Sequence, residues 1–161
     1  VGRDKKRVGA WAKQAAWVWA SEYVVPWVTA ESKHAQTLAL KWMDAKQEHI
    51  AAAGWCTYAG IMTTTADDEL DFAEIKALLK RVEKEIDGAK NRVRYTMNGF
   101  VIAVGSAVTP LAKQAHATAK KIGKVQVDMR GTACKVPVAS DYITKIEKAG
   151  RAGKKRSALR C

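Results

Sequence analysis

The chain has 161 residues, 48% of them apolar, and a formal net charge of +12 at pH 7. This length suits one hydrophobic core and is too short to require two independent domains. Lys, Glu or Asp recurs in every apolar segment, so none reaches the roughly 18 to 20 uninterrupted apolar residues of a membrane-spanning helix. The composition therefore excludes a membrane-spanning protein and predicts a soluble one.

The three cysteines, Cys56, Cys134 and Cys161, are odd in number and show no CxxC spacing. They predict reduced thiols, and hence a cytoplasmic protein. The histidines also lack the spacing of metal ligands: His34, His49 and His116. We therefore expect neither a metal ion nor a cofactor.

The first expected helix runs from Val8 to Val25 and contains Trp11, Trp17 and Trp19. Pro26 is expected to end it, because proline lacks the backbone N–H that continues a helix. Tryptophans at helical spacing are usually core residues. Trp19 is the one that we expect to face a groove.

Three antiparallel helix pairs are expected to follow, because apolar residues recur at three- and four-residue spacing in each segment. Asp71 and Glu74 have the spacing of a capping box, and Gly88 offers a left-handed end to the same helix. Ser32 and Ser140 are expected to cap the first and the last of these helices. The expected helices are Ser32–Ala45, Glu48–Met62, Asp71–Asp87, Asn91–Val108, Thr109–Gly123 and one that begins at Ser140 and carries Tyr142, Ile143 and Ile146.

The pairs begin at Ser32, Asp71 and Thr109, which are 39 and 38 residues apart. This period is close to the roughly 40-residue unit of HEAT-type solenoids. Three unrelated helical hairpins in an ordinary bundle would also fit. The sequence thus predicts an all-α fold of stacked helix pairs.

The pattern predicts a helical domain over residues 1–150 and a basic tail over residues 151–161 that is mobile without a partner. Lys124 to Asp128 alternates like a strand but has no pairing partner, so we expect an extended loop. The chain begins with Val1 rather than Met, which indicates a fragment of a longer protein.

Positive charge is concentrated in the last third of the chain. Residues 109–161 contain 13 Lys and Arg against three acidic residues, a net charge of +10. Such a segment attracts phosphates or an acidic surface. A solvated basic tail with no specific partner is the alternative.

Three motifs carry a family resemblance: Asn91-Arg92-Val93-Arg94-Tyr95-Thr96-Met97-Asn98-Gly99-Phe100, Ile122-Gly123-Lys124-Val125 and Thr132-Ala133-Cys134-Lys135-Val136-Pro137. With Ala51-Ala52-Ala53-Gly54-Trp55, they resemble the C-terminal half of DNA alkylation repair proteins. The resemblance implies an armadillo-type superhelix of HEAT-like repeats whose concave basic surface grips duplex DNA. Enzymes of that family hydrolyse the N-glycosidic bond of N3- or N7-alkylated purines, with a carboxylate and aromatic faces near the developing positive charge.

The resemblance also suggests site residues. The family's catalytic helix has a Trp shortly before an Asp, and the nearest match here is Trp19 with Glu22 as the carboxylate. An exposed acid at a helix end is the alternative for Glu22. A second DNA-facing aromatic falls at Phe100 instead of Trp, and a DNA-contacting Arg falls near Ala53.

Arg92 and Arg94 are candidate phosphate ligands, because they open a helix whose N-terminus carries partial positive charge. A second set would neutralise phosphates without reading sequence. It comprises Lys120, Lys121, Lys124, Lys135, Arg151, Lys154, Lys155 and Arg156. We therefore expect a monomer that binds the backbone of duplex DNA. The alternative is a non-catalytic helical scaffold for an acidic protein.

Overall fold

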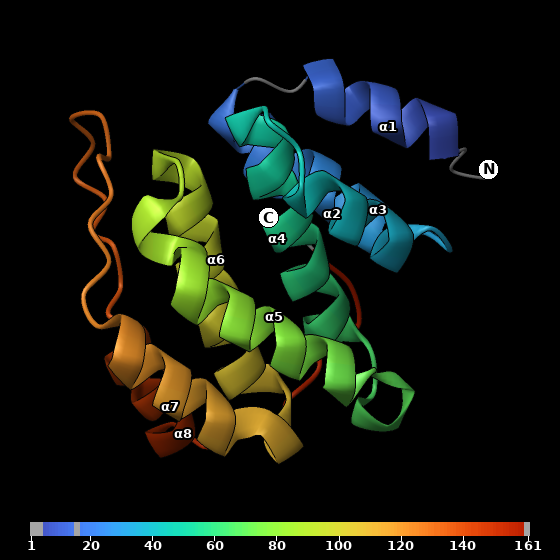
Figure 1. Cartoon of the computed structure of the whole chain (residues 1–161). Coiled ribbons are helices and arrows are strands. Elements are labelled where there is room, and N and C mark those ends of the chain that lie inside the picture. The colour runs from blue at the N-terminus through green and yellow to red at the C-terminus, as the bar shows by residue number, and fades with distance from the viewer. Residues whose placement is uncertain (1–4, 15–16, 160–161) are drawn as a thin grey trace.

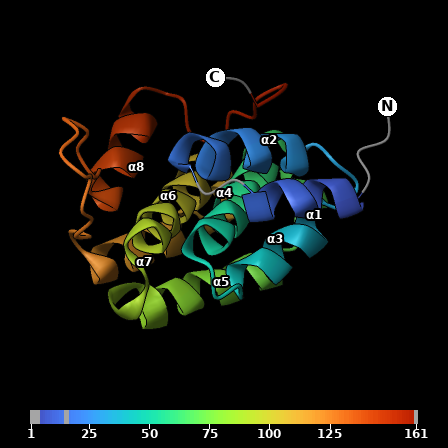
Figure 2. The ribbon, with the colours of Figure 1, turned by 90° about the horizontal axis from the view of Figure 1, so that it is seen from above.

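Helices pack in two layers in the computed structural model, which describes residues 5–14 and 17–159 (Figure 1). Helices α2, α4, α6 and α8 form one layer, called here the inner layer, and α3, α5 and α7 form the outer layer (Figure 2). No strand occurs within the described ranges, which confirms the all-α prediction. The helices are α1 Lys5–Gln14, α2 Val25–Ala30, α3 Ala35–Met43, α4 Glu48–Thr64, α5 Phe72–Glu85, α6 Asn91–Ala107, α7 Ala112–Ile122 and α8 Ala139–Lys148.

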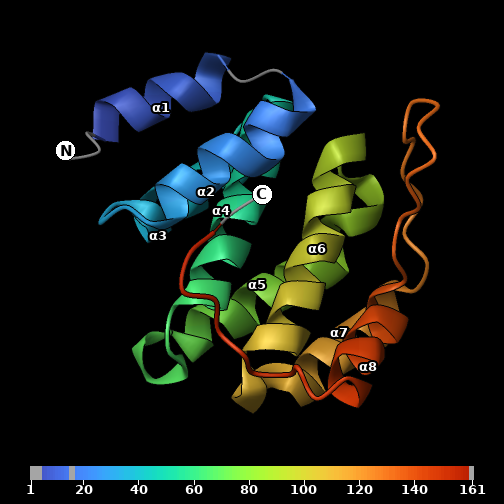
Figure 3. The same ribbon diagram turned by 180° about the vertical axis from the view of Figure 1, so that it is seen from behind.

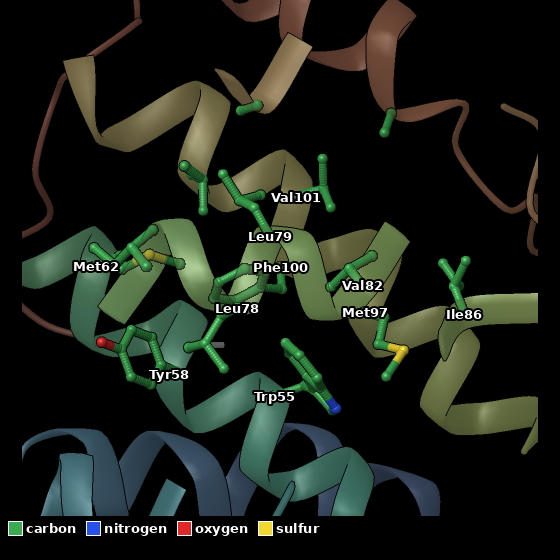
Figure 4. Close-up of a cluster of buried hydrophobic side chains, with 14 of the residues drawn as sticks. Trp55, Tyr58, Met62, Leu78, Leu79, Val82, Ile86, Met97, Phe100 and Val101 are labelled. Carbon is green, nitrogen blue, oxygen red and sulfur yellow. The ribbon is translucent and has the colours of Figure 1, made fainter. Parts of the chain in front are cut away.

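The main core lies between the two layers and is centred on α4, α5 and α6 (Figure 4). Trp55 and Phe100 are fully buried there, with their ring centroids 5.1 Å apart at an interplanar angle of 73°. Gly54 allows α4 to approach α3 closely. A Cβ atom at Gly54 would lie 2.6 Å from the Met43 backbone nitrogen and 2.7 Å from the Ala39 carbonyl oxygen.

The ends of α5 follow the sequence prediction in part. The Asp71 carboxylate accepts a hydrogen bond of 3.0 Å from the backbone N–H of Glu74, as predicted. The Glu74 carboxylate does not return the bond but accepts from Tyr58 and Gln36, so the capping box is half formed. Gly88 ends a 3-10 turn, Ile86–Gly88, and lacks the positive φ that was expected.

The N-terminal prediction was wrong about Pro26. A π-helical turn, η1 (Ala20–Val24), leads directly into α2, and the backbone N–H of Val25 donates to the Ala20 carbonyl. Pro26 therefore falls in the first turn of α2, where a missing N–H costs little. The helix continues through it to Ala30.

Both serine caps were also placed wrongly. Helix α3 begins at Ala35, and Ser32 forms the preceding turn by accepting from the backbone N–H of His34. Helix α8 has Val138 as its N-cap, and the Ser140 hydroxyl lies inside the first turn, where it donates to the Asp141 carboxylate. Local sequence does not separate a cap from a polar residue one position into a helix.

Residues 151–159 form a C-terminal strap that crosses the inner layer over α6 and α4 (Figure 3). The backbone N–H of Gly153 donates to the Ser106 carbonyl, and that of Arg156 donates to the Thr63 carbonyl, each at 2.8 Å. The Lys155 ammonium donates to the Met62 carbonyl and pairs with Asp67 at 2.7 Å. The strap is thus tied to the domain by these contacts, which the sequence did not indicate.

No single helix in the described part of the chain is long and apolar enough to cross a membrane. One pair, Asn91–Ala107 with Thr109–Ile122, meets the length and composition together and is bent by 113°.

Candidate nucleic-acid interface

A pocket of about 200 Å³ opens on the inner layer where η1, α2, α4 and α6 meet the C-terminal strap. We call it the inner-face pocket. Its walls combine one acid, several aromatic rings, a thiol and one strap cation. The residues that matter below are Glu22, Tyr23, Trp27, Cys56, Tyr95 and Arg156.

Glu22, which lines the inner-face pocket, forms an ion pair with Arg92. The Arg92 Nε donates to Glu22 Oε1 and its Nη2 donates to Glu22 Oε2, both at 2.6 Å. The Glu22 side chain is 2% exposed and that of Arg92 is 11% exposed. The two hydrogen bonds that Arg92 donates to Glu22 are the main reason why the pKa of Arg92 is raised. The pair is therefore a charged, bidentate unit.

Arg92 also joins several elements around this pair. Its backbone N–H donates to the Glu48 carboxylate at 2.7 Å, which links the first turn of α6 to that of α4. Its guanidinium carbon lies 4.4 Å from the centre of the Tyr95 ring, a cation–π distance. Its Nη1 contacts the Met129 sulfur at 3.5 Å, in the loop between α7 and α8. Arg92 is thus engaged on every side by the protein.

Aromatic rings line one wall of the site in a ladder along η1 and α2. The Trp19 and Tyr23 ring centroids are 5.1 Å apart, and the Tyr23 and Trp27 centroids are 5.4 Å apart. Trp19 is 60% exposed at the open end of this ladder. Burial, with smaller contributions from Tyr95 and Glu22, raises the pKa of Tyr23 to about 12. The ladder is a neutral surface at physiological pH.

Burial also acts on Tyr95 and Cys56. It raises the pKa of Tyr95 and raises that of Cys56 well above the usual thiol value, so both groups stay protonated. Among the described residues, no three His, Cys, Asp or Glu side chains lie together in a way that could hold a metal ion. The pocket therefore offers hydrogen-bonding groups, aromatic rings for stacking and one ion pair whose two charges compensate each other.

No protein-family model matches the sequence. The fold, however, resembles a solved structure with a TM-score of 0.90 and 30% identity, covering 98% of this chain and 67% of that chain. That structure represents a new family of proteins related to the HEAT-like repeat DNA glycosylases with affinity for branched DNA structures. The chain belongs to this family. The HEAT-like fold and the relation to HEAT-like repeat DNA glycosylases are thereby confirmed.

Two curated relatives of this chain come from Listeria. They are the uncharacterized proteins Lin0241 of Listeria innocua serovar 6a, 33% identical, and Lmo0209 of Listeria monocytogenes serovar 1/2a, 32% identical, each over 118 residues. Each match covers 73% of this chain and 50% of the relative. The chain therefore spans about half the length of these curated relatives.

The structure bears on three of the residues singled out in the sequence: Glu22, Phe100 and Arg92. Glu22 is buried, so the alternative of an exposed helix-end acid is wrong, and both its oxygens are held by Arg92. Phe100 packs in the core between Trp55 and Tyr58 and has no exposed surface for DNA. Arg92 is occupied by Glu22 and offers no free guanidinium to a phosphate.

The other cations that the sequence analysis assigned to DNA lie in three places. Lys120 and Lys121 lie on α7 in the outer layer, where Lys121 pairs with Glu83 at 2.6 Å. A second group is on the loop between α7 and α8 and on the C-terminal strap. It comprises Lys124, Lys135, Arg151, Lys154, Lys155 and Arg156, of which Lys155 is half-buried and the others are exposed. Arg94 is half-buried on α6 beside Tyr95.

Tyr23 and Trp27 were not identified from the sequence as site residues, nor was the pairing of Glu22 with Arg92. Tyr23 and Trp27 follow Trp19 at four-residue intervals, a spacing that places their rings on one helical face and was visible in the sequence. The link between Glu22 and Arg92 had no such signal, because the two residues are 70 positions apart.

Proposed function

We propose that this protein binds branched DNA through the phosphate backbone, using the inner layer and the C-terminal strap. Support comes from the solved relative, which has affinity for branched DNA structures and matches 98% of this chain. The observation that carries the proposal is the position of the strap. It brings Arg151, Lys154 and Arg156, all exposed, across the same face as the inner-face pocket.

The geometry favours binding over base excision. A carboxylate that stabilises an oxocarbenium-like sugar must present its negative charge to the substrate. The Glu22 charge is compensated by two hydrogen bonds of 2.6 Å from Arg92, deep in the pocket. We therefore assign Glu22 to holding Arg92 and the helix ends in place, and base excision is the second candidate function.

The test is equilibrium binding over a salt series, with a four-way junction and a linear duplex of the same total length. Each phosphate neutralised lowers the log–log slope of affinity against salt by about 0.9. We expect a slope of several units and tighter binding to the junction. Equal affinity for the two DNAs would contradict the preference for branches. Absence of binding to both at low salt would favour the scaffold for an acidic protein.

A further inference from the structure

A second basic surface lies at the end of the molecule formed by α1 and α3, opposite α7 and α8 (Figures 1 and 3). Here a cleft of about 610 Å³ opens between the two helices. We call it the lysine cleft. Its rim is formed by Lys5, Lys6, Lys13 and Lys41, and its floor includes Leu38 and Ile50.

The packing of α1 determines which residues face the lysine cleft. Val8 and Ala12, each 1% exposed, pack on the cluster formed by α2, α3 and α4. Since residues four apart share one face of a helix, the remaining stripe of Lys5, Gly9 and Lys13 borders the cleft. A contact of 3.3 Å between the Lys13 carbonyl oxygen and His49 Nε2 ties the end of α1 to α4.

The lining of the lysine cleft is positively charged. Its lining has four lysines and no acidic residue. Lys5, Lys13 and Lys41 are exposed and form no ion pair with any residue in the described ranges. Asp44, close in sequence to Lys41, is held by Arg81 at 2.8 Å. A cluster of this kind is complementary to a polyanion.

The dimensions fit a tract of nucleic-acid backbone better than one phosphate group. From Lys5 to Lys13 the helix rises about 12 Å, at about 1.5 Å per residue. On B-form DNA that length corresponds to about three or four phosphates of one strand, at about 3.4 Å each. Lys41 on α3 lies across the cleft and adds a cation from the opposite rim.

We propose that the lysine cleft binds the phosphate backbone of a second duplex arm of branched DNA. This inference rests on the proposed function, in which the first arm lies on the inner layer. The lysine cleft shares no lining residue with the inner-face pocket, and its lysines lie on α1 and α3, which contribute no residue to that pocket. Two separate basic surfaces allow one protein to contact two arms that leave a branch point in different directions. A linear duplex on the inner layer does not need the cleft.

The test is the triple variant Lys5→Glu, Lys13→Glu and Lys41→Glu in the full chain. A matched control, Lys76→Glu, Lys80→Glu and Lys84→Glu, makes the same charge change with three exposed lysines of α5 in the outer layer. Thermal unfolding followed by circular dichroism verifies that both variants fold. Affinity for a four-way junction and for a linear duplex is then measured over a salt series.

We expect the triple variant to lose roughly tenfold or more in junction affinity and about three units of salt slope, since each lysine–phosphate contact contributes about one unit. Linear-duplex binding should be unchanged, and the control should keep junction affinity within about twofold. Unchanged junction affinity in the triple variant would overturn the inference and leave the proposed function standing. An equal loss on linear DNA, or in the control, would also overturn it. A wild-type protein that binds neither DNA would refute both proposals.

Discussion

Arg92 and Glu22, 70 positions apart in the chain, form a bidentate ion pair with two hydrogen bonds of 2.6 Å beneath the inner-face pocket. The pair joins η1 to the first turn of α6. Because the Arg92 backbone N–H also donates to Glu48, the same residue joins α6 to α4. Three elements of the inner layer thus converge on one guanidinium group.

Replacing Arg92 by Ala should strongly destabilise the protein, because it leaves the Glu22 carboxylate buried without a partner. Loss of one partner of a buried ion pair costs about 3–5 kcal/mol. The free energy of unfolding from urea titration measures the effect. The double variant Glu22→Gln with Arg92→Met should lose less free energy of unfolding than the sum of the losses in Glu22→Gln alone and in Arg92→Met alone. Strict additivity would show that the pair contributes nothing beyond its separate side chains.

Base release tests whether the Glu22 carboxylate, paired with Arg92, takes part in catalysis. We expect no release of N7-methylguanine from alkylated duplex DNA by the wild-type protein above the uncatalysed rate, because the Glu22 charge is compensated by Arg92. High-performance liquid chromatography of the released base measures this. Release that is lost in Glu22→Gln, with the variant still folded, would instead make Glu22 a catalytic residue.

Amphipathic helices could be predicted from the sequence because their signal is local. The apolar positions of α5, including Ile75, Leu79 and Val82, are buried where the three- and four-residue spacing placed them. Phe100 was assigned to DNA because a family position was carried over without knowledge of packing. Its burial depends on Trp55, which lies one helix pair away. Tertiary contacts of this kind have no local signature.

The position of the C-terminal strap could not be predicted from local sequence either. Its sequence has no apolar periodicity, so composition indicated a mobile tail. Its attachment depends on carbonyl groups at the end of α4, which accept from Lys155 and from the backbone N–H of Arg156. Those acceptors are free because the last carbonyls of a helix have no intrahelical partner.

Gly54→Ala should destabilise the fold, because the added Cβ would lie 2.6 Å from the Met43 backbone nitrogen. Backbone atoms of α3 cannot move aside as a flexible side chain would, so we expect a cost of about 1–3 kcal/mol or more. Gly99→Ala is the matched control in α6, where no atom lies within 4 Å of the added Cβ. That variant should gain up to about 1 kcal/mol from helix propensity. Urea titration compares the two, and equal stability would refute the close packing of α3 and α4.

The raised pKa of Tyr23 predicts how the free energy of unfolding changes in alkaline solution. Burial raises the pKa of its phenol from 10.0 to about 12, so the folded state favours the neutral form more than the unfolded state does. This contribution to stability is fully present below pH 10 and is lost as the pH rises from about 10 to about 12. In Tyr23→Phe the loss over this interval should be smaller than in the wild-type protein. The difference isolates Tyr23, because every other titratable group is common to both proteins. Parallel stability curves from urea titrations at pH 9, 10 and 11 would show that Tyr23 ionises as it does in the unfolded chain.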